Sequence, residues 1–273
     1  MRIVLTIVAG ILLTGAAFCQ IADFDNTPYS PGFYVQGYPV YSSASNAYNS
    51  DGDSYDIGDT RSQMGFAARP AYYGMLGQNR WMVSAVLPFA SVDPGLGDSE
   101  AGISDIQLSA AYWLIDQHKE GMYLSAWLWA DLPTGDDEKY LGTGQMDIRP
   151  GLAFAKESQQ WRAQASMYYN IRMENSDTNF KPGNEFWANA DFGYWVNPQL
   201  MPGLEFQTGF GQDATINDVD SPDSGEQWFR VGPYAEYQIN PQFGLKLAGL
   251  YNAIGKNTDQ SLDIQARLTY SIK

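Results

Sequence analysis

The sequence has little of the residues on which most catalytic and metal sites depend. It contains one cysteine, Cys19, and one histidine, His118, among 273 residues. A single cysteine excludes a disulfide framework within the chain and a thiolate metal cluster, and a single histidine excludes any site that needs two histidine ligands. A Ser–His hydrolase would need its histidine on a strand beside a serine, whereas His118 lies in the polar turn 116–120. We therefore expect a solvated histidine, no enzyme site, no metal and no cofactor.

Basic residues are also scarce. Lysine and arginine number 16 against 31 aspartate and glutamate residues, which gives a formal net charge of −15. Because nucleic-acid binding needs patches of lysine and arginine on the phosphates, this balance argues against a nucleic-acid partner. Two acidic stretches, 51–56 and 218–223, offer carboxylates of the kind that calcium prefers. Neither completes an EF-hand loop, and we interpret both as solvated acidic loops.

Long apolar runs are missing except at the start of the chain. Arg2 precedes the apolar run 3–13, and the small residues 15–17 follow it. A charged start, a short apolar stretch and a small-residue end are typical of a secretory signal peptide. The run is shorter than the roughly 20 apolar residues that a membrane-spanning helix requires.

We predict that the signal peptide covers residues 1–19 and that residues 20–273 form a single domain. Cleavage after Ala17 and cleavage after Cys19 both fit the pattern. A lipid anchor on Cys19 is disfavoured because Phe18 fills the preceding position, where a small residue is needed.

What the sequence does contain is aromatic residues in strictly alternating segments. Aromatics make up 14% of the chain and charged residues only 17%. In the last segment Ile264 and Leu268 fall on one side, whereas Asp263 and Arg267 fall on the other. A period of two indicates β-strands, and helical periodicity is hard to find. The twelve predicted strands lie near 31–42, 61–73, 80–90, 102–115, 121–132, 145–155, 160–173, 185–196, 199–210, 227–239, 242–253 and 261–272.

The connections between these strands alternate between long and short. The long ones are 43–60, 91–101, 133–144, 174–184, 211–226 and 254–260. The short ones are 74–79, 116–120, 156–159, 197–199 and 240–242. Bacterial outer-membrane barrels combine an even number of strands with short periplasmic turns and long extracellular loops. The sequence therefore predicts an all-β protein, a closed antiparallel transmembrane β-barrel of about 12 strands in the bacterial outer membrane, with both termini periplasmic.

A soluble β-sandwich or barrel would also alternate, but its apolar face would point inward. The predicted signal peptide, the aromatic strand ends and the loop asymmetry favour the opposite orientation, with lipid on the apolar face. The predicted lumen, which is the candidate solute path, then comprises Asp105, Trp127, Trp129, Asp131, Asp147, Arg149, Arg162, Arg172, Arg230 and Arg267. Because isolated charges in a narrow lumen are costly, we expect the inward aspartates to pair with inward arginines. These ion pairs would either stabilise the barrel or form a polar constriction that selects solutes.

Several short motifs in the middle of the chain carry a family resemblance. They are GISDIQL at 102–108, AAYW at 110–113, ADLPTG at 130–135, GTG at 142–144 and DIRPG at 147–151. This succession resembles the outer-membrane transporter family labelled "MetA-pathway of phenol degradation". The motifs cover roughly residues 95–155, and only the barrel periodicity extends over the rest. The resemblance implies a barrel that transports small apolar or aromatic compounds. It does not assign a ligand contact to any residue of this sequence.

Two hypotheses of function follow. In the first, the barrel is an outer-membrane channel or transporter for small molecules, with hydrophobic or aromatic compounds as candidates. In the second, it is a non-transporting surface or structural barrel whose acidic loops bind ions or a partner. The expected partners are outer-membrane lipid and lipopolysaccharide, the outer-membrane assembly machinery and a small-molecule solute. The terminal aromatic that this machinery commonly recognises is set back to Tyr270.

Overall fold

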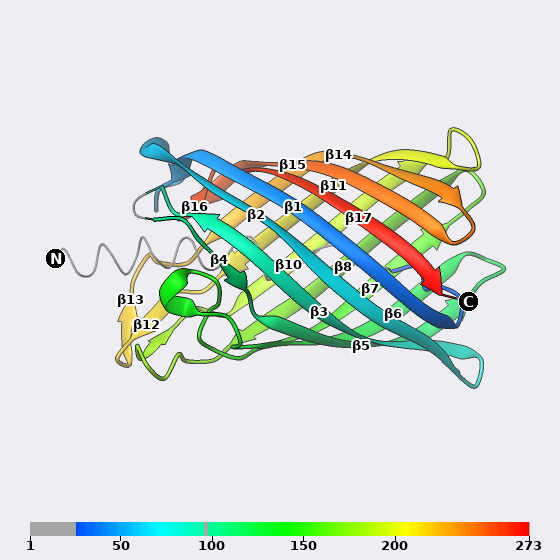
Figure 1. Cartoon of the computed structure of the whole chain (residues 1–273), viewed down its shortest axis with the longest axis horizontal. Helices are drawn as coiled ribbons and strands as arrows, with labels where there is room; N and C mark the ends of the chain where they lie inside the picture. The colour runs from blue at the N-terminus through cyan, green and yellow to red at the C-terminus, as the bar shows by residue number, and fades with distance from the viewer. Residues whose placement is uncertain (1–25, 96–97, 273) are drawn as a thin grey trace.

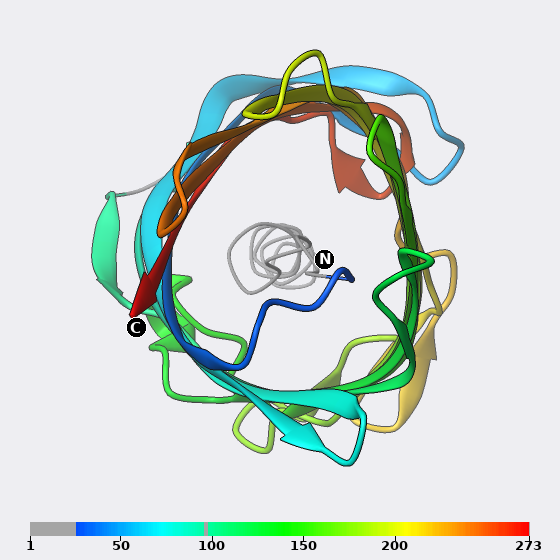
Figure 2. The same cartoon turned by 90° about the vertical axis from the view of Figure 1, so that its right-hand side faces the viewer.

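The computed structural model describes residues 26–95 and 98–272. Within these residues, twelve long antiparallel strands form one closed barrel (Figures 1 and 2). The number of strands and the fold class predicted from the sequence are confirmed, whereas the predicted signal peptide at 1–19 lies outside the described residues. The long strands are β1 (Gly32–Tyr48), β2 (Ser54–Leu76), β3 (Asn79–Asp93), β5 (Ile106–Gln117), β6 (Met122–Leu132), β7 (Asp147–Glu157), β8 (Trp161–Arg172), β10 (Glu185–Tyr194), β11 (Leu200–Gly211), β14 (Gln227–Asn240), β15 (Phe243–Lys256) and β17 (Leu262–Ile272).

The barrel closes between its first and last strands. Val35 of β1 pairs with Tyr270 of β17 on one side and with Pro70 of β2 on the other. The remaining long strands pair in chain order around the barrel. Closure pairs the two edges that an open sheet would expose, as a backbone surrounded by hydrocarbon requires.

The outward face of the barrel is apolar. Leu152 of β7, Met167 of β8 and Phe206 of β11 are exposed on the outside, whereas their inward neighbours Arg149 and Ser166 are buried. A soluble barrel would show the reverse arrangement, so this surface faces lipid. In the described parts of the chain, no helix is both long enough and apolar enough to cross a membrane.

One end of the barrel carries the short turns. Asn197 accepts hydrogen bonds at Oδ1 from the backbone N–H groups of Gln199 and Leu200. Asn240 accepts the corresponding pair in the second Asn-Pro-Gln turn. Such asparagine turns reverse the chain without a long loop. β1 begins and β17 ends at this same end (Figure 1), which we assign to the periplasm.

The opposite end carries the long loops and the accessory elements. β9 (Phe180–Lys181), β12 (Ala214–Ile216) and β13 (Val219–Ser221) form a small separate sheet. β4 (Glu100–Ile103) pairs with the last residues of β3, and β16 (Thr258–Asp259) pairs with β1. The short helix η1 (Asp137–Lys139) lies in the loop between β6 and β7. Figure 1 shows β4, β12, β13 and β16 gathered at this end.

One predicted connection is wrong in length. The segment 43–60 is mostly strand, because β1 continues to Tyr48 and β2 begins at Ser54. Tyr48 is buried and donates a hydrogen bond from its hydroxyl to the carbonyl of Ala253 on β15. This contact with a distant strand holds the first hairpin in extended form beyond the predicted end of the strand.

Candidate solute path through the barrel

The residues predicted for the lumen lie on inward positions of five strands, with Asp105 as the exception. Alternation along each strand brings their side chains to the same face, away from the apolar exterior. They are Trp127, Trp129 and Asp131 on β6, Asp147 and Arg149 on β7, Arg162 and Arg172 on β8, Arg230 on β14, and Arg267 on β17.

The ion pairs predicted for the lumen are present. Toward the long-loop end they join Arg149 to Asp131, Arg172 to Asp147 at 3.6 Å and to Glu185 at 3.3 Å, and Arg230 to Asp263 at 3.4 Å. All of these side chains are at most a tenth exposed. Pairing offsets part of the cost of removing the charges from water.

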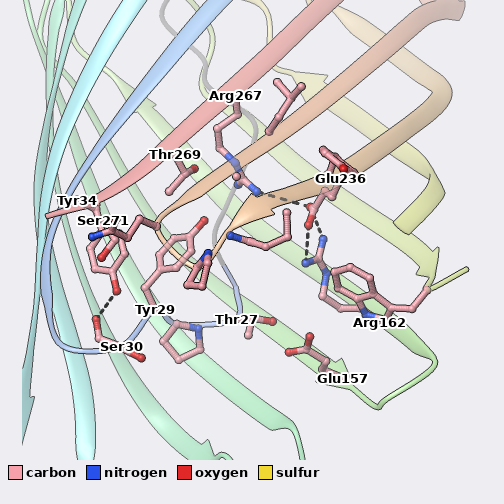
Figure 3. Close-up of a pocket in the computed structure, with 18 of the residues that line it drawn as sticks. Thr27, Tyr29, Ser30, Tyr34, Glu157, Arg162, Glu236, Arg267, Thr269 and Ser271 are labelled. Atoms are coloured by element: carbon pink, nitrogen blue, oxygen red, sulfur yellow. Dashed lines mark hydrogen bonds and ion pairs between the residues drawn. The ribbon is translucent and has the colours of Figure 1, made fainter. Parts of the chain in front are cut away.

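A second ion cluster lies near the short-turn end. Both terminal nitrogens of Arg162 donate to the carboxylate of Glu236, and Arg267 approaches the same carboxylate to 3.6 Å (Figure 3). Arg162 is on β8 and Glu236 on β14, with β10 and β11 between them. This ion pair therefore reaches across several strands instead of joining neighbours.

Two further contacts also join strands that are not direct neighbours. Lys246 of β15 donates to Glu205 of β11 at 3.0 Å, and Tyr234 of β14 donates to Asp191 of β10 at 3.1 Å. We use the term charged wall for this side of the lumen, on β8 to β17, defined by Arg162, Glu205, Glu236, Lys246 and Arg267.

Asp105 requires a correction, because it does not pair with an arginine. The predicted strand 102–115 is divided into β4 and β5, and Asp105 lies in the break. Its carboxylate accepts hydrogen bonds from the backbone N–H groups of Thr134, Gly135 and Thr143, and a fourth from the Thr143 hydroxyl. Burial raises the pKa of this carboxyl above its ordinary value, although the four hydrogen bonds act in the opposite direction. Asp105 fixes the loop that follows β6, and this role interrupts its own strand.

Aromatic rings line the other side of the lumen. The rings follow one another with centroid separations of 4.8 to 5.9 Å. In order they are Tyr29, Tyr34, Tyr73, Trp113, Trp127 and Trp129. We use the term aromatic wall for this series, which apart from Tyr29 comes from β1, β2, β5 and β6. Its last ring, Trp129, lies beneath the guanidinium groups of Arg69 and Arg149.

The residues before β1 fold into the barrel, which the sequence did not predict. Figure 2 shows this dark blue segment turning from the wall into the opening. Arg80 donates to the carbonyls of Pro28 and Tyr29, and the indole N–H of Trp113 donates to the carbonyl of Asn26. These contacts hold segment 26–31 against the aromatic wall.

A cavity of about 350 Å³ remains on the other side of this segment (Figure 3). Tyr29 and Thr27 form one boundary, and Arg162, Glu236 and Arg267 form the other. The cavity lies at the short-turn end, where Gln242 of the second Asn-Pro-Gln turn also lines it. It thus joins the aromatic wall to the charged wall.

Several lumen residues were missed by the sequence prediction. Glu205, Glu236 and Lys246 lie in the lumen but are not among the residues predicted for it. The signal for Lys246 was available, because Leu245 and Leu247 flank it at outward positions. Arg80 follows from the alternation of β3, but its buried partner Asp116 does not, because a register shift between Trp113 and Ile115 reverses the alternation of β5.

In the described residues, the carboxylates of the acidic loops and the single histidine do not come together around a common point. In the first hairpin the Asn49 amide oxygen accepts the N–H groups of Asp51 and Asp53, and both aspartates are exposed. Within the described ranges, no group of three histidine, cysteine or acidic side chains could hold a metal ion. His118 is exposed in its turn, with Nδ1 3.1 Å from the hydroxyl of Tyr123.

Comparison with known families identifies the chain. The family described as "Putative MetA-pathway of phenol degradation" matches residues 44–268, which is most of the barrel. The chain belongs to this family. The resemblance drawn from the motifs at 102–151 is confirmed and extends well beyond them. No curated protein matches the sequence.

Solved structures share the fold at low sequence identity. A crystal structure of an outer membrane channel from Pseudomonas putida F1 has a TM-score of 0.81 and 15% identity, covering 93% of this chain and 100% of that one. The β-domain of the Bordetella autotransporter BrkA has a TM-score of 0.53 and 13% identity, with coverages of 89% and 100%. The NanC porin has a TM-score of 0.51 and 10% identity, with coverages of 88% and 99%. At these identities the likeness establishes the barrel fold.

Proposed function

We propose that this member of the family is a non-enzymatic outer-membrane channel through which small aromatic molecules cross. The observation that carries the proposal is the aromatic wall, six rings in succession from Tyr29 at the short-turn end to Trp129. Aromatic pairs gain about 0.5–1.5 kcal/mol beyond area burial. Tyr29 and Tyr34 line the cavity at the short-turn end and offer an aromatic solute ring contacts there. The inner rings, from Tyr73 to Trp129, are at most 5% exposed and continue the same wall into the barrel.

The pairing of lumen charges supports neutral solutes over ions. Arg162 and Arg267 share Glu236, and Lys246 meets Glu205. Paired charges produce a weaker field along the path than rings of one sign, which select ions in charged pores. A polar but locally neutralised wall therefore keeps the lumen hydrated while the opposite wall holds the ring of the solute.

Uptake by intact cells tests this function. A porin-deficient Gram-negative host that produces the protein is expected to take up a labelled aromatic compound faster than the empty host. Replacing the two rings that line the cavity, Tyr29→Ala with Tyr34→Ala, should reduce this gain roughly tenfold, because each lost ring contact is worth about 0.5–1.5 kcal/mol. Trp161→Ala is the matched control, since Trp161 stacks on Phe192 on the outward face.

Conductance of purified protein in planar bilayers provides an independent measurement. A narrow lumen with paired charges should give small, weakly ion-selective currents that added aromatic solute interrupts. Absence of conductance, together with unchanged uptake by the producing host, would contradict transport. It would favour the non-transporting barrel instead.

A further inference from the structure

Two adjacent rows of inward side chains on β8, β10, β11 and β14 differ in chemistry. The first row consists of Tyr168, Trp187, Gly209 and Trp228, which are register partners in that order. The second row, two residues along each strand, consists of Ser166, Asn189, Gln207 and Arg230. We call them the aromatic shelf and the amide row. Two residues along a strand span about 6.6–6.8 Å, roughly the length of a substituted benzene ring.

The aromatic shelf is rigidly packed. The rings of Trp187 and Trp228 meet edge to face at 4.6 Å, and Tyr168 packs on Trp187 at 5.3 Å. Gly209 makes this possible, because a Cβ at that position would lie 2.4 Å from the Trp228 ring. The absent side chain lets Trp228 extend across β11 toward Trp187.

The amide row contains polar atoms that the protein does not satisfy. Gln207 is 1% exposed, and its Nε2 donates to Glu205 at 2.7 Å. Among the described residues, its Oε1 has no hydrogen-bond partner, and neither amide atom of Asn189 has one, although all three are shielded from solvent. Asn189 and Gln207 are directly paired across β10 and β11. Buried amides are almost always hydrogen-bonded, so this cluster is unusual for a purely structural wall.

The neighbouring charged groups have contacts of their own, although Nε of Arg230 has no hydrogen-bond partner among the described residues. Arg230 lies over the ring of Trp228 and faces Asp263 at 3.4 Å, and Glu205 accepts from Lys246. The amide row therefore offers both an N–H donor and carbonyl acceptors beside an aromatic surface. A hydroxyl group both donates and accepts, and it matches this set.

We propose that the aromatic shelf and the amide row together form a binding site for an aromatic molecule that carries a hydroxyl group. Its ring lies against Trp187 and Trp228, and its hydroxyl accepts from Asn189 Nδ2 and donates to Gln207 Oε1. An aromatic molecule without the hydroxyl contacts the shelf but leaves the amides unpaired, so the site discriminates against it. This inference rests on the proposed function, because the molecule must enter the lumen to reach the site.

Fluorine NMR on the purified barrel in detergent micelles tests the inference with two probes of equal size. 4-Fluorophenol and 4-fluorotoluene differ in a hydroxyl against a methyl group, and empty micelles correct for partitioning. Wild type should bind 4-fluorophenol more tightly. The double variant Asn189→Leu with Gln207→Met should weaken 4-fluorophenol about fivefold, the factor given by one neutral hydrogen bond of ~1 kcal/mol, and leave 4-fluorotoluene within about twofold.

Two further variants keep the test decisive. Trp187→Leu should weaken both probes, because it removes the shelf and leaves the amides in place. Gln107→Met is the matched control, since Gln107 is as buried as Gln207 and its Nε2 has no hydrogen-bond partner among the described residues. Gln107 lies on β5, which four strands separate from β11, so this substitution should change neither affinity. Heat-modifiable migration on gels shows that each variant has folded.

Two results would overturn the site. In the first, the Asn189→Leu, Gln207→Met variant loses affinity for both probes equally. In the second, Gln107→Met weakens 4-fluorophenol binding as much as that double variant does. The proposed function fails separately, through absent uptake and conductance in the wild type. A channel that conducts aromatics but shows no preference for 4-fluorophenol would keep the function and remove this inference.

Discussion

The aromatic wall and the charged wall line the same lumen but are held together differently. Rings such as Trp113 and Trp127 come from neighbouring strands, β5 and β6, and pack on each other at 5.8 Å. In the charged wall, Arg162 reaches Glu236 across two intervening strands. The first kind of contact is short-ranged and tolerant of small shifts, whereas the second depends on the curvature of the closed barrel.

This difference determines how each wall should respond to substitution. A ring that loses a neighbour still contacts others, because dispersion and area burial are spread over many atoms. A buried guanidinium that loses its carboxylate retains the cost of desolvation without the attraction that offset it. We therefore expect removal of one charge from the charged wall to destabilise the barrel more than a substitution at the aromatic wall.

The largest effect is expected for Glu236→Gln. This substitution removes the carboxylate shared by Arg162 and Arg267, and breaking a buried pair in this way typically costs about 3–5 kcal/mol. Urea unfolding of the barrel in lipid vesicles, followed by tryptophan fluorescence, measures the change. Glu236→Asp keeps the charge and serves as control; if it is as unstable as Glu236→Gln, side-chain length and not charge decides.

A smaller effect is expected for Asp131→Asn at the edge of the aromatic wall. Asp131 pairs with Arg149 on the adjacent strand β7, and Arg149 also lies over the ring of Trp129. Because the guanidinium keeps this ring contact, we expect a loss of about 1–3 kcal/mol. The same urea experiment measures it. A loss larger than that of Glu236→Gln would reverse the ranking of the two walls.

The long-loop end of the barrel should respond to pH. Burial and the nearby carboxylate of Glu185 raise the pKa of Glu226 to about 8, from 4.5. The folded protein therefore binds this proton more tightly than the unfolded chain does. The resulting stability is fully present below pH 4.5 and is lost as the pH rises through about 8.

Unfolding midpoints on either side of this window check the sign. Wild type should unfold at a lower urea concentration at about pH 9 than at about pH 5 if Glu226 acts as described. Glu226→Gln should reduce the difference, because glutamine cannot titrate. An unchanged pH dependence in this variant would assign the effect to other groups.

Alternation alone predicted the barrel and most of its lumen. A strand with a period of two has only two faces, so an inward Arg162 follows once the outward Ala163 and Trp161 are known to face lipid. Parity therefore predicted the ion pairs between neighbouring strands, such as Arg149 with Asp131. The pair between Arg162 and Glu236 could not be predicted, because it depends on how far the closed barrel brings β8 and β14 together.

Two other features of the lumen could not be predicted from the alternation. Segment 26–31 has no periodicity, and its place in the lumen depends on Arg80 and Trp113, which are distant in sequence. Asp105 continues the alternation of the predicted strand, so parity gave it a lumen position. The four hydrogen bonds that it accepts from the loop after β6 outweighed strand continuity, and this competition is not visible in a single sequence.

The smallest effect is expected outside both walls, for Lys256→Met. Lys256 approaches Asp223 to 3.8 Å, but the aspartate side chain is 81% exposed. Water and salt screen such a pair, so its removal should change stability by less than about 1 kcal/mol. The adjacent Asn257 donates from Nδ2 to the carbonyls of Asp223 and Gly225, and these contacts hold the loop without the ion pair. Asn257→Ala should therefore destabilise the barrel more than Lys256→Met in the same urea experiment; the opposite order would show that charge, and not backbone hydrogen bonding, holds the loop.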